Sequence, residues 1–78
     1  MRKKELKTVV TFHTTADAMA MEQACKIRGI PGRIIPVPRV LSAGCGLAWC
    51  SPAELMEALR QIMEEDGIQE EEICQMVI

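Results

Sequence analysis

The first pattern along the chain is a β-branched and aromatic run, Thr-Val-Val-Thr-Phe at residues 8–12, which predicts a strand. Directly after it, Thr14 and Thr15 are suited to cap a helix, with Asp17 in its first turn. Apolar residues then recur at helical spacing until Gly29, namely Ala18, Met21, Ala24 and Cys25. The pattern therefore predicts a helix that starts straight after the first strand and ends at this glycine.

Two further strands are predicted in the middle of the chain. Residues 33–37 are rich in β-branched side chains and lie between Pro31-Gly32 and Pro38. Pro36 falls inside this strand, and proline cannot donate a hydrogen bond to a neighbouring strand. The second strand is therefore expected at an edge of the sheet, with a third strand following at residues 47–50.

The segment Ser51-Pro52-Ala53-Glu54 has the form of a helix start, with an N-cap, a proline at the first helical position and a capping glutamate. An apolar stripe follows at the i, i+3, i+4, i+7 spacing, formed by Leu55, Ala58, Leu59 and Ile62. Gly67 supplies a left-handed stop. We predict a helix over residues 52–65 whose stripe faces the sheet, then an acidic turn at residues 70–72 and a last strand at residues 73–78.

The predicted order is βαββαβ within 78 residues. So short a chain holds a single hydrophobic core, because domains usually occupy roughly 100–200 residues. This order favours a ferredoxin-like α+β sandwich, in which two helices lie on one face of a four-stranded antiparallel sheet. We predict this fold for one domain that spans residues 1–78.

Composition and charge exclude several classes of function. Lysine and arginine number 9 against 11 acidic residues, and the only aromatic residues are Trp49 and Phe12. This balance and the lack of stacking platforms argue against nucleic acid as a partner. No apolar run approaches the roughly 20 residues that span a bilayer, and the basic start is not followed by a continuous signal-peptide core. We therefore expect a cytoplasmic protein with reduced thiols and no membrane partner.

The most unusual segment is the long connection between the second and third strands, which ends in Gly44-Cys45-Gly46. A tight hairpin needs only about two to five residues. Glycine on both sides removes steric cover from the thiol and lets the backbone take left-handed conformations. Cys45 is therefore expected to be exposed and reactive.

The predicted topology brings this connection to the start of the first helix. Thr14 and Thr15 lie at this start, and the backbone N–H groups near residues 15–18, together with the helix dipole, would favour the thiolate form of Cys45. The negative charge of Asp17 opposes this effect. His13 lies at the same junction and can act as a proton acceptor or orient the thiol, although a cap or surface role is favoured for it. Arg39 and Arg33 are candidates to supply positive charge.

The remaining sulfur-containing and acidic residues favour structural roles. Cys25 continues the buried helix stripe, and Cys50 and Cys74 lie in strands, where free cysteine behaves as a small hydrophobe. No Cys-x-x-Cys pair is present and there is a single histidine, so we expect no metal site. The methionines are expected to fill the core, and the acidic residues near the C-terminus to form a solvated face.

Four segments resemble a small bacterial family, the selenium/sulfur (Se/S) carrier protein-like family: residues 11–15, 18–22, 32–38 and 42–48. The combination of Gly-Arg-Ile-Ile-Pro-Val-Pro with Ser42-Ala43-Gly44-Cys45-Gly46 is the specific part, and the resemblance covers about residues 8–52. It implies a carrier whose glycine-flanked cysteine, matching Cys45, holds a persulfide or a selenium adduct taken from a cysteine desulfurase-like donor.

The leading hypothesis is thus a stoichiometric carrier, not an enzyme, that accepts sulfur or selenium on Cys45 and passes it to an acceptor enzyme without any cofactor. In this hypothesis Ser42, Gly44 and Gly46 shape the carrier loop. One alternative is a small regulatory domain that binds an anionic ligand or a protein partner through the same loop. Another is a redox sensor, although no resolving thiol is evident. The sequence leaves the oligomeric state open.

Overall fold

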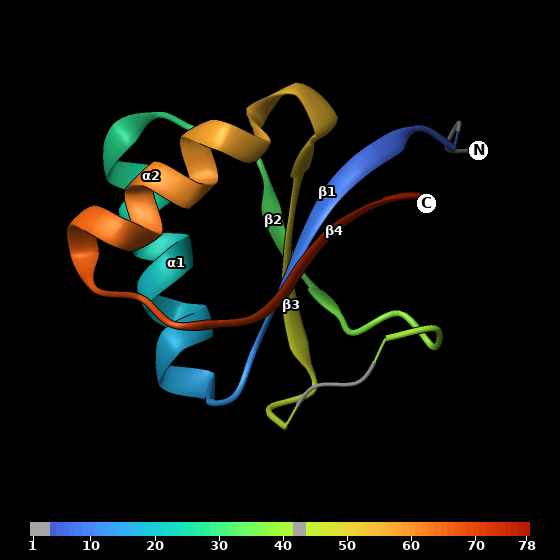
Figure 1. The fold of residues 1–78 in the computed structure, drawn as a ribbon, viewed down its shortest axis with the longest axis horizontal. Helices are drawn as coiled ribbons and strands as arrows, with labels where there is room; N and C mark the ends of the chain where they lie inside the picture. The colour runs from blue at the N-terminus through green and yellow to red at the C-terminus, as the bar shows by residue number, and fades with distance from the viewer. Residues whose placement is uncertain (1–3, 42–43) are drawn as a thin grey trace.

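The computed structural model describes residues 4–41 and 44–78. Its elements are β1 (Leu6–Phe12), α1 (Thr15–Arg28), β2 (Arg33–Pro36), β3 (Leu47–Pro52), a 3-10 turn η1 (Ala53–Leu55), α2 (Met56–Asp66) and β4 (Glu70–Val77). The strands form one antiparallel sheet in the order β2-β3-β1-β4, and both helices cover the same face of it (Figure 1). The predicted ferredoxin-like α+β fold is confirmed, and β2 lies at an edge as its proline indicated.

The first helix forms where the sequence predicts it, because both of its ends are capped. The Thr14 Oγ1 atom accepts a hydrogen bond from the Asp17 backbone N–H at 3.2 Å. At the other end, Gly29 has a φ of 71°, which an L side chain rarely adopts. The strand and the helix are separated by only two residues, so the β1–α1 junction is tight.

The start of the second helix differs from the prediction. Ser51 belongs to β3 and is buried; its hydroxyl donates to the Pro31 carbonyl at 2.8 Å and accepts from the Trp49 indole N–H at 2.8 Å. The predicted N-cap is therefore wrong, because tertiary partners occupy the hydroxyl that would cap the helix. The chain passes through η1 before α2 begins, and Gly67 ends α2 with a φ of 67° as predicted.

The acidic segment at residues 70–72 is also placed differently. It forms the first part of β4 and pairs with the end of β1, with Phe12 opposite Glu70 and Thr11 opposite Glu72. The prediction of an acidic turn is wrong, since the sheet register draws these charged residues into the edge strand.

The core lies between the helices and the sheet. Its fully buried members include Val10, Phe12, Ala18, Met21, Cys25 and Leu59, and Trp49, Ile62 and Met63 are almost as deeply buried. The predicted stripe of α2 does face the sheet, although Leu55 and Ala58 are only half-buried. Within the described residues, no helix is long and apolar enough to cross a membrane.

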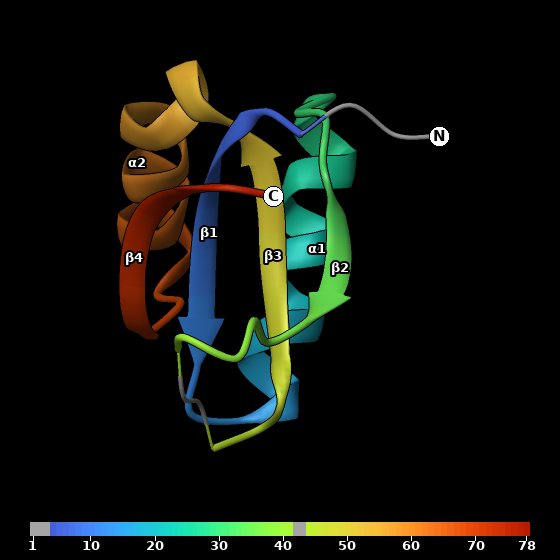
Figure 2. The same cartoon turned by 90° about the vertical axis from the view of Figure 1, so that its right-hand side faces the viewer.

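The other face of the sheet carries no helix and is called here the open face (Figure 2). The strand register sets one row of residues across it: Arg33, Cys50, Val9 and Cys74. Val9 and Cys50 are buried in spite of the missing helix, and Cys74 is half-buried. Ile35, two residues after Arg33 on β2, points to the same face because side chains alternate along a strand.

The cysteines that were predicted to be structural lie in the core or in the sheet. Cys25 is fully buried, and this burial raises its pKa to about 11 against a lowering effect of Arg28. Burial also raises the pKa of Cys50, and the pKa of Cys74 is raised first by burial and then by Glu72. All three thiols are therefore held in their neutral form at neutral pH.

Candidate functional site

The β2–β3 connection and the β1–α1 junction lie at the same end of the sheet, as both Figure 1 and Figure 2 show. The connection is closed at its base by a hydrogen bond from the Val37 N–H to the Gly46 carbonyl at 3.1 Å. Gly44 lies directly against the His13 backbone, since a Cβ added at Gly44 would stand 2.9 Å from the His13 carbonyl oxygen. The predicted meeting of the cysteine loop with the start of α1 is confirmed.

Cys45 is half-buried, and its side chain packs against the core. The prediction of an exposed thiol is wrong in this respect, because the turn points the sulfur inward. The backbone N–H of Leu47 donates to Cys45 Sγ at 3.4 Å, and the thiol can donate in turn to the Leu47 carbonyl at 3.4 Å. A backbone N–H aimed at the sulfur is a partner that can stabilise negative charge there.

Each of the flanking glycines has its own structural reason. Gly44 is required by close approach, because any side chain at this position meets the His13 backbone. Gly46 is required by its backbone, because its φ of 73° is one that L side chains rarely adopt. The space beside it is open, since a Cβ at this position would meet nothing within 4 Å. The turn is therefore tight on the Gly44 side and open on the Gly46 side, which leaves room for an approaching group.

Glu71 is a site residue that the sequence analysis missed. The register between β1 and β4 shifts between Thr11 and Phe12, so that Glu71 is the extra residue of a β-bulge. Its Oε1 atom accepts from the Gly44 N–H at 3.2 Å and lies 3.3 Å from His13 Nδ1. One carboxylate thus ties the cysteine loop to the β1–α1 junction. No spacing in the sequence signals it, because a bulge depends on the partner strand.

The remaining predicted residues contribute unequally. The Thr14 hydroxyl serves the helix cap, donating to the Asp17 carboxylate at 3.0 Å as well as accepting its N–H. Thr15 is the exposed first residue of α1. Arg39 is exposed in the turn closed by the Leu41 N–H and the Pro38 carbonyl, and no ion pair forms on it among the described residues. Ser42 lies outside the described residues.

Arg33 does not belong to this site. It pairs with Cys50 near the far end of β3, whereas Cys45 precedes Leu47 at the start of that strand. Three residues along a strand correspond to roughly 10 Å. The expectation that Arg33 supplies charge to Cys45 is therefore wrong, and its positive charge acts on the Cys50 thiol.

A comparison with known families places this geometry in context. A family model described as "Putative Se/S carrier protein-like" matches residues 7–75. The chain belongs to this family. The match includes Cys45, His13 and Glu71, so the whole tied loop lies within the family domain, and the resemblance noted in the sequence is confirmed. No match was found among curated proteins or among solved structures.

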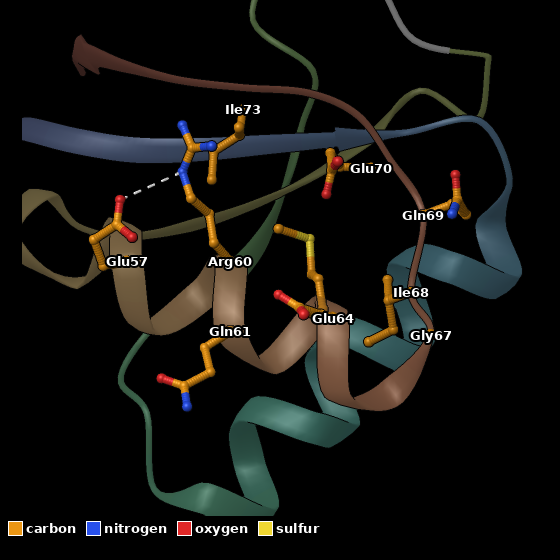
Figure 3. A pocket seen from close by; sticks show the side chains of 10 residues that line it. Glu57, Arg60, Gln61, Glu64, Gly67, Ile68, Gln69, Glu70 and Ile73 are labelled. Carbon is orange, nitrogen blue, oxygen red and sulfur yellow. Dashed lines mark ion pairs between the residues drawn. The ribbon is translucent and has the colours of Figure 1, made fainter.

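A groove of about 670 Å³ lies between α2 and β4 of this carrier-like domain (Figure 3). Glu57, Glu64 and Glu70 contribute carboxylates to it, and Arg60 pairs with Glu57 at 3.7 Å. Among the described residues that line the groove there is no cysteine. No group of three or more metal-ligating side chains gathers anywhere in residues 4–41 and 44–78.

Replacing Glu71 by Ala is expected to make Cys45 more reactive, because the loop loses its tie to the β1–α1 junction. A hydrogen bond of about 1 kcal/mol corresponds to a roughly fivefold larger population of the open loop. The measurement is the rate of Cys45 alkylation by iodoacetamide, followed by mass spectrometry of the Cys45 peptide. Glu72→Ala, which removes the exposed neighbouring carboxylate, is the matched control and should leave the rate unchanged. Equal rates in both variants would show that Glu71 does not hold the loop.

Proposed function

We propose that Cys45 carries one sulfur or selenium atom and delivers it to an acceptor enzyme. The observation that carries this proposal is the environment of Cys45 Sγ, which accepts the Leu47 N–H at 3.4 Å in a turn that is open beside Gly46. The family to which the chain belongs supports a carrier role. This domain then acts stoichiometrically, one adduct for each molecule, and is not a catalyst.

Loading is a thiol exchange in which atoms and electrons balance. The Cys45 thiolate attacks the outer sulfur of a persulfide on a cysteine desulfurase-like donor; a new S–S bond forms, the old one breaks and the donor cysteine leaves as a thiolate. With selenium, the donor presents a perselenide and the new bond is S–Se. Delivery repeats the exchange, since an acceptor thiolate attacks the terminal atom and Cys45 returns as a thiolate. One persulfide is consumed for each one formed, so no oxidant or reductant is needed.

The described residues have distinct parts in this exchange. The Leu47 N–H stabilises charge on the Cys45 sulfur, whether it attacks or leaves. In this proposal His13, whose Nδ1 lies 3.3 Å from Glu71 Oε1 and whose backbone lies against Gly44, exchanges a proton at this end of the sheet. Packing against the core covers one side of Cys45, so a bound adduct is partly shielded from solvent.

The test is intact-mass spectrometry of the protein after incubation with a cysteine desulfurase and either cysteine or selenocysteine. The expected result is a mass increase of one sulfur or one selenium atom, which is removed by a reducing agent and maps to the Cys45 peptide after digestion. The cargo is the element whose adduct forms at the lower donor concentration. An unmodified protein with every competent donor, or an adduct that maps to another cysteine, would contradict the proposal.

A further inference from the structure

A second hollow lies at the opposite end of the sheet from Cys45, on the open face. It has a volume of about 560 Å³, within the ~300–1,000 Å³ typical of small-molecule pockets. The N-terminal stretch, the start of β2 and the end of β3 form its walls, and the lining residues used below are Lys4, Lys7, Arg33, Ile35, Cys50 and Pro52. Two backbone hydrogen bonds between Glu5 and Ile78, at 3.2 Å and 3.1 Å, close its rim.

The charges around this hollow are mainly positive. Lys4, Lys7 and Arg33 line it, and of these Lys7 is neutralised by Glu5 at 3.3 Å. Among the described residues, no ion pair forms on Lys4 or Arg33. Among the described residues that line the hollow, Glu5 is the only one with a carboxylate side chain. Arg33 stands opposite Cys50 in the sheet register, and both residues line the hollow together with Lys7. Burial raises the pKa of Cys50, and Lys7 and Arg33 lower it in part.

The rest of the lining is apolar. Ile35, Pro52 and Ile78 are half-buried, and Cys50 is almost fully buried beneath them. A guanidinium beside an apolar surface suits a ligand that has a carboxylate or phosphate at one end and an apolar body at the other. The planar guanidinium binds either anion with two hydrogen bonds, and the apolar surface contacts the body. An inorganic anion alone would leave the apolar wall unused.

We propose that this pocket binds a small amphipathic anion, a carboxylate or a phosphate monoester with a short apolar body. Arg33 and Lys4 hold the anionic group, and Ile35 and Pro52 contact the body. The site is separate from the carrier thiol, since Cys45 precedes β3 and the pocket lies at the strand's other end. The proposal therefore does not rest on transfer by Cys45.

The experiment is an NMR titration of the whole chain, following backbone amide shifts. Four probes are used: hexanoate and hexyl phosphate, which combine charge and body, hexanol with the body alone and acetate with the charge alone. We expect the shifts to centre on Gly32, Arg33 and Cys50, with hexanoate or hexyl phosphate binding at least tenfold more tightly than hexanol and acetate. Whichever of the two amphipathic probes binds more tightly identifies the anionic group as carboxylate or phosphate.

The variants make the test specific. Arg33→Gln is expected to raise the dissociation constant about tenfold, since it removes a charge-assisted pair, and Lys4→Gln should raise it less. The matched control is Arg60→Gln, which removes the same charge from α2 and should leave binding unchanged. Cys45→Ser should also bind as the wild type does, which separates this site from the carrier thiol. Equal affinity for hexanol and hexanoate, or equal binding by Arg33→Gln and Arg60→Gln, would overturn the proposal.

Discussion

Replacing Leu59 by Ala is expected to lower the free energy of unfolding by about 2–5 kcal/mol. Leu59 lies in the middle of α2, is fully buried and belongs to the core cluster between the helices and the sheet. Truncation removes apolar surface and leaves a cavity that a closely packed core fills only in part. In so small a domain this loss is a large part of the total stability.

Urea unfolding followed by circular dichroism measures the change in the free energy of unfolding. The matched control is Leu6→Ala, the same chemical change at a position that is 50% exposed. It should cost less than about 1 kcal/mol, because the side chain has little contact to lose. A loss below about 0.5 kcal/mol at Leu59 would mean that this face of α2 does not pack on the sheet.

Elements whose signals are local could be predicted from the sequence. The first helix follows from its caps, because Thr14 and Gly29 act through hydrogen bonds and backbone angles within a few residues. The edge position of β2 follows from Pro36, since a missing N–H disfavours a place between two strands. These two features, with the order of elements, were enough to predict the ferredoxin-like fold.

Ser51 shows where local reasoning fails. The segment at residues 51–54 has the residues of a capping box, but a hydroxyl can make the same bonds to other partners. Here Trp49 and Pro31 hold it inside the sheet, so the strand extends to Pro52 and the helix starts later. Neither partner is indicated by the spacing around Ser51. The position of the helix start therefore depends on tertiary structure.

The candidate site was predicted in part. The choice of Cys45 rests on its glycines and its long connection, and the topology brought the neighbouring Gly44 against His13 as expected. Glu71 was out of reach, because it enters the site through a bulge that depends on the register of β1 and β4. The same dependence explains why Arg33 was wrongly assigned to Cys45. Its place beside Cys50 is fixed by the pairing between β2 and β3.

Cys45 and Cys50, which lie near opposite ends of β3, therefore have different environments. At its start, Cys45 is half-buried in a turn and receives a backbone N–H. Near its end, Cys50 is buried, with a pKa raised by that burial and lowered in part by Lys7 and Arg33. Accessible sulfur chemistry favours the first position, whereas the second has the charges that suit an anionic ligand.

Replacing Cys45 by Ser is expected to abolish adduct formation completely while leaving the fold intact. A hydroxyl cannot form the persulfide, because the reaction needs a thiolate as nucleophile. The serine Oγ can still accept the Leu47 N–H, so the turn keeps its hydrogen bond, and the half-buried position has limited packing to lose. The measurements are intact mass after incubation with the desulfurase, and urea unfolding of the same sample.

Two other cysteines supply controls that separate chemistry from folding. Cys74→Ser changes a half-buried thiol on the open face and should retain the full adduct. Cys25→Ala should do the opposite of Cys45→Ser, since it removes a fully buried side chain and weakens the core while sparing the adduct. If the Cys45→Ser protein still gained the mass of one sulfur or selenium atom, another thiol would be the carrier and the proposed role of the glycine-flanked turn would have to be abandoned.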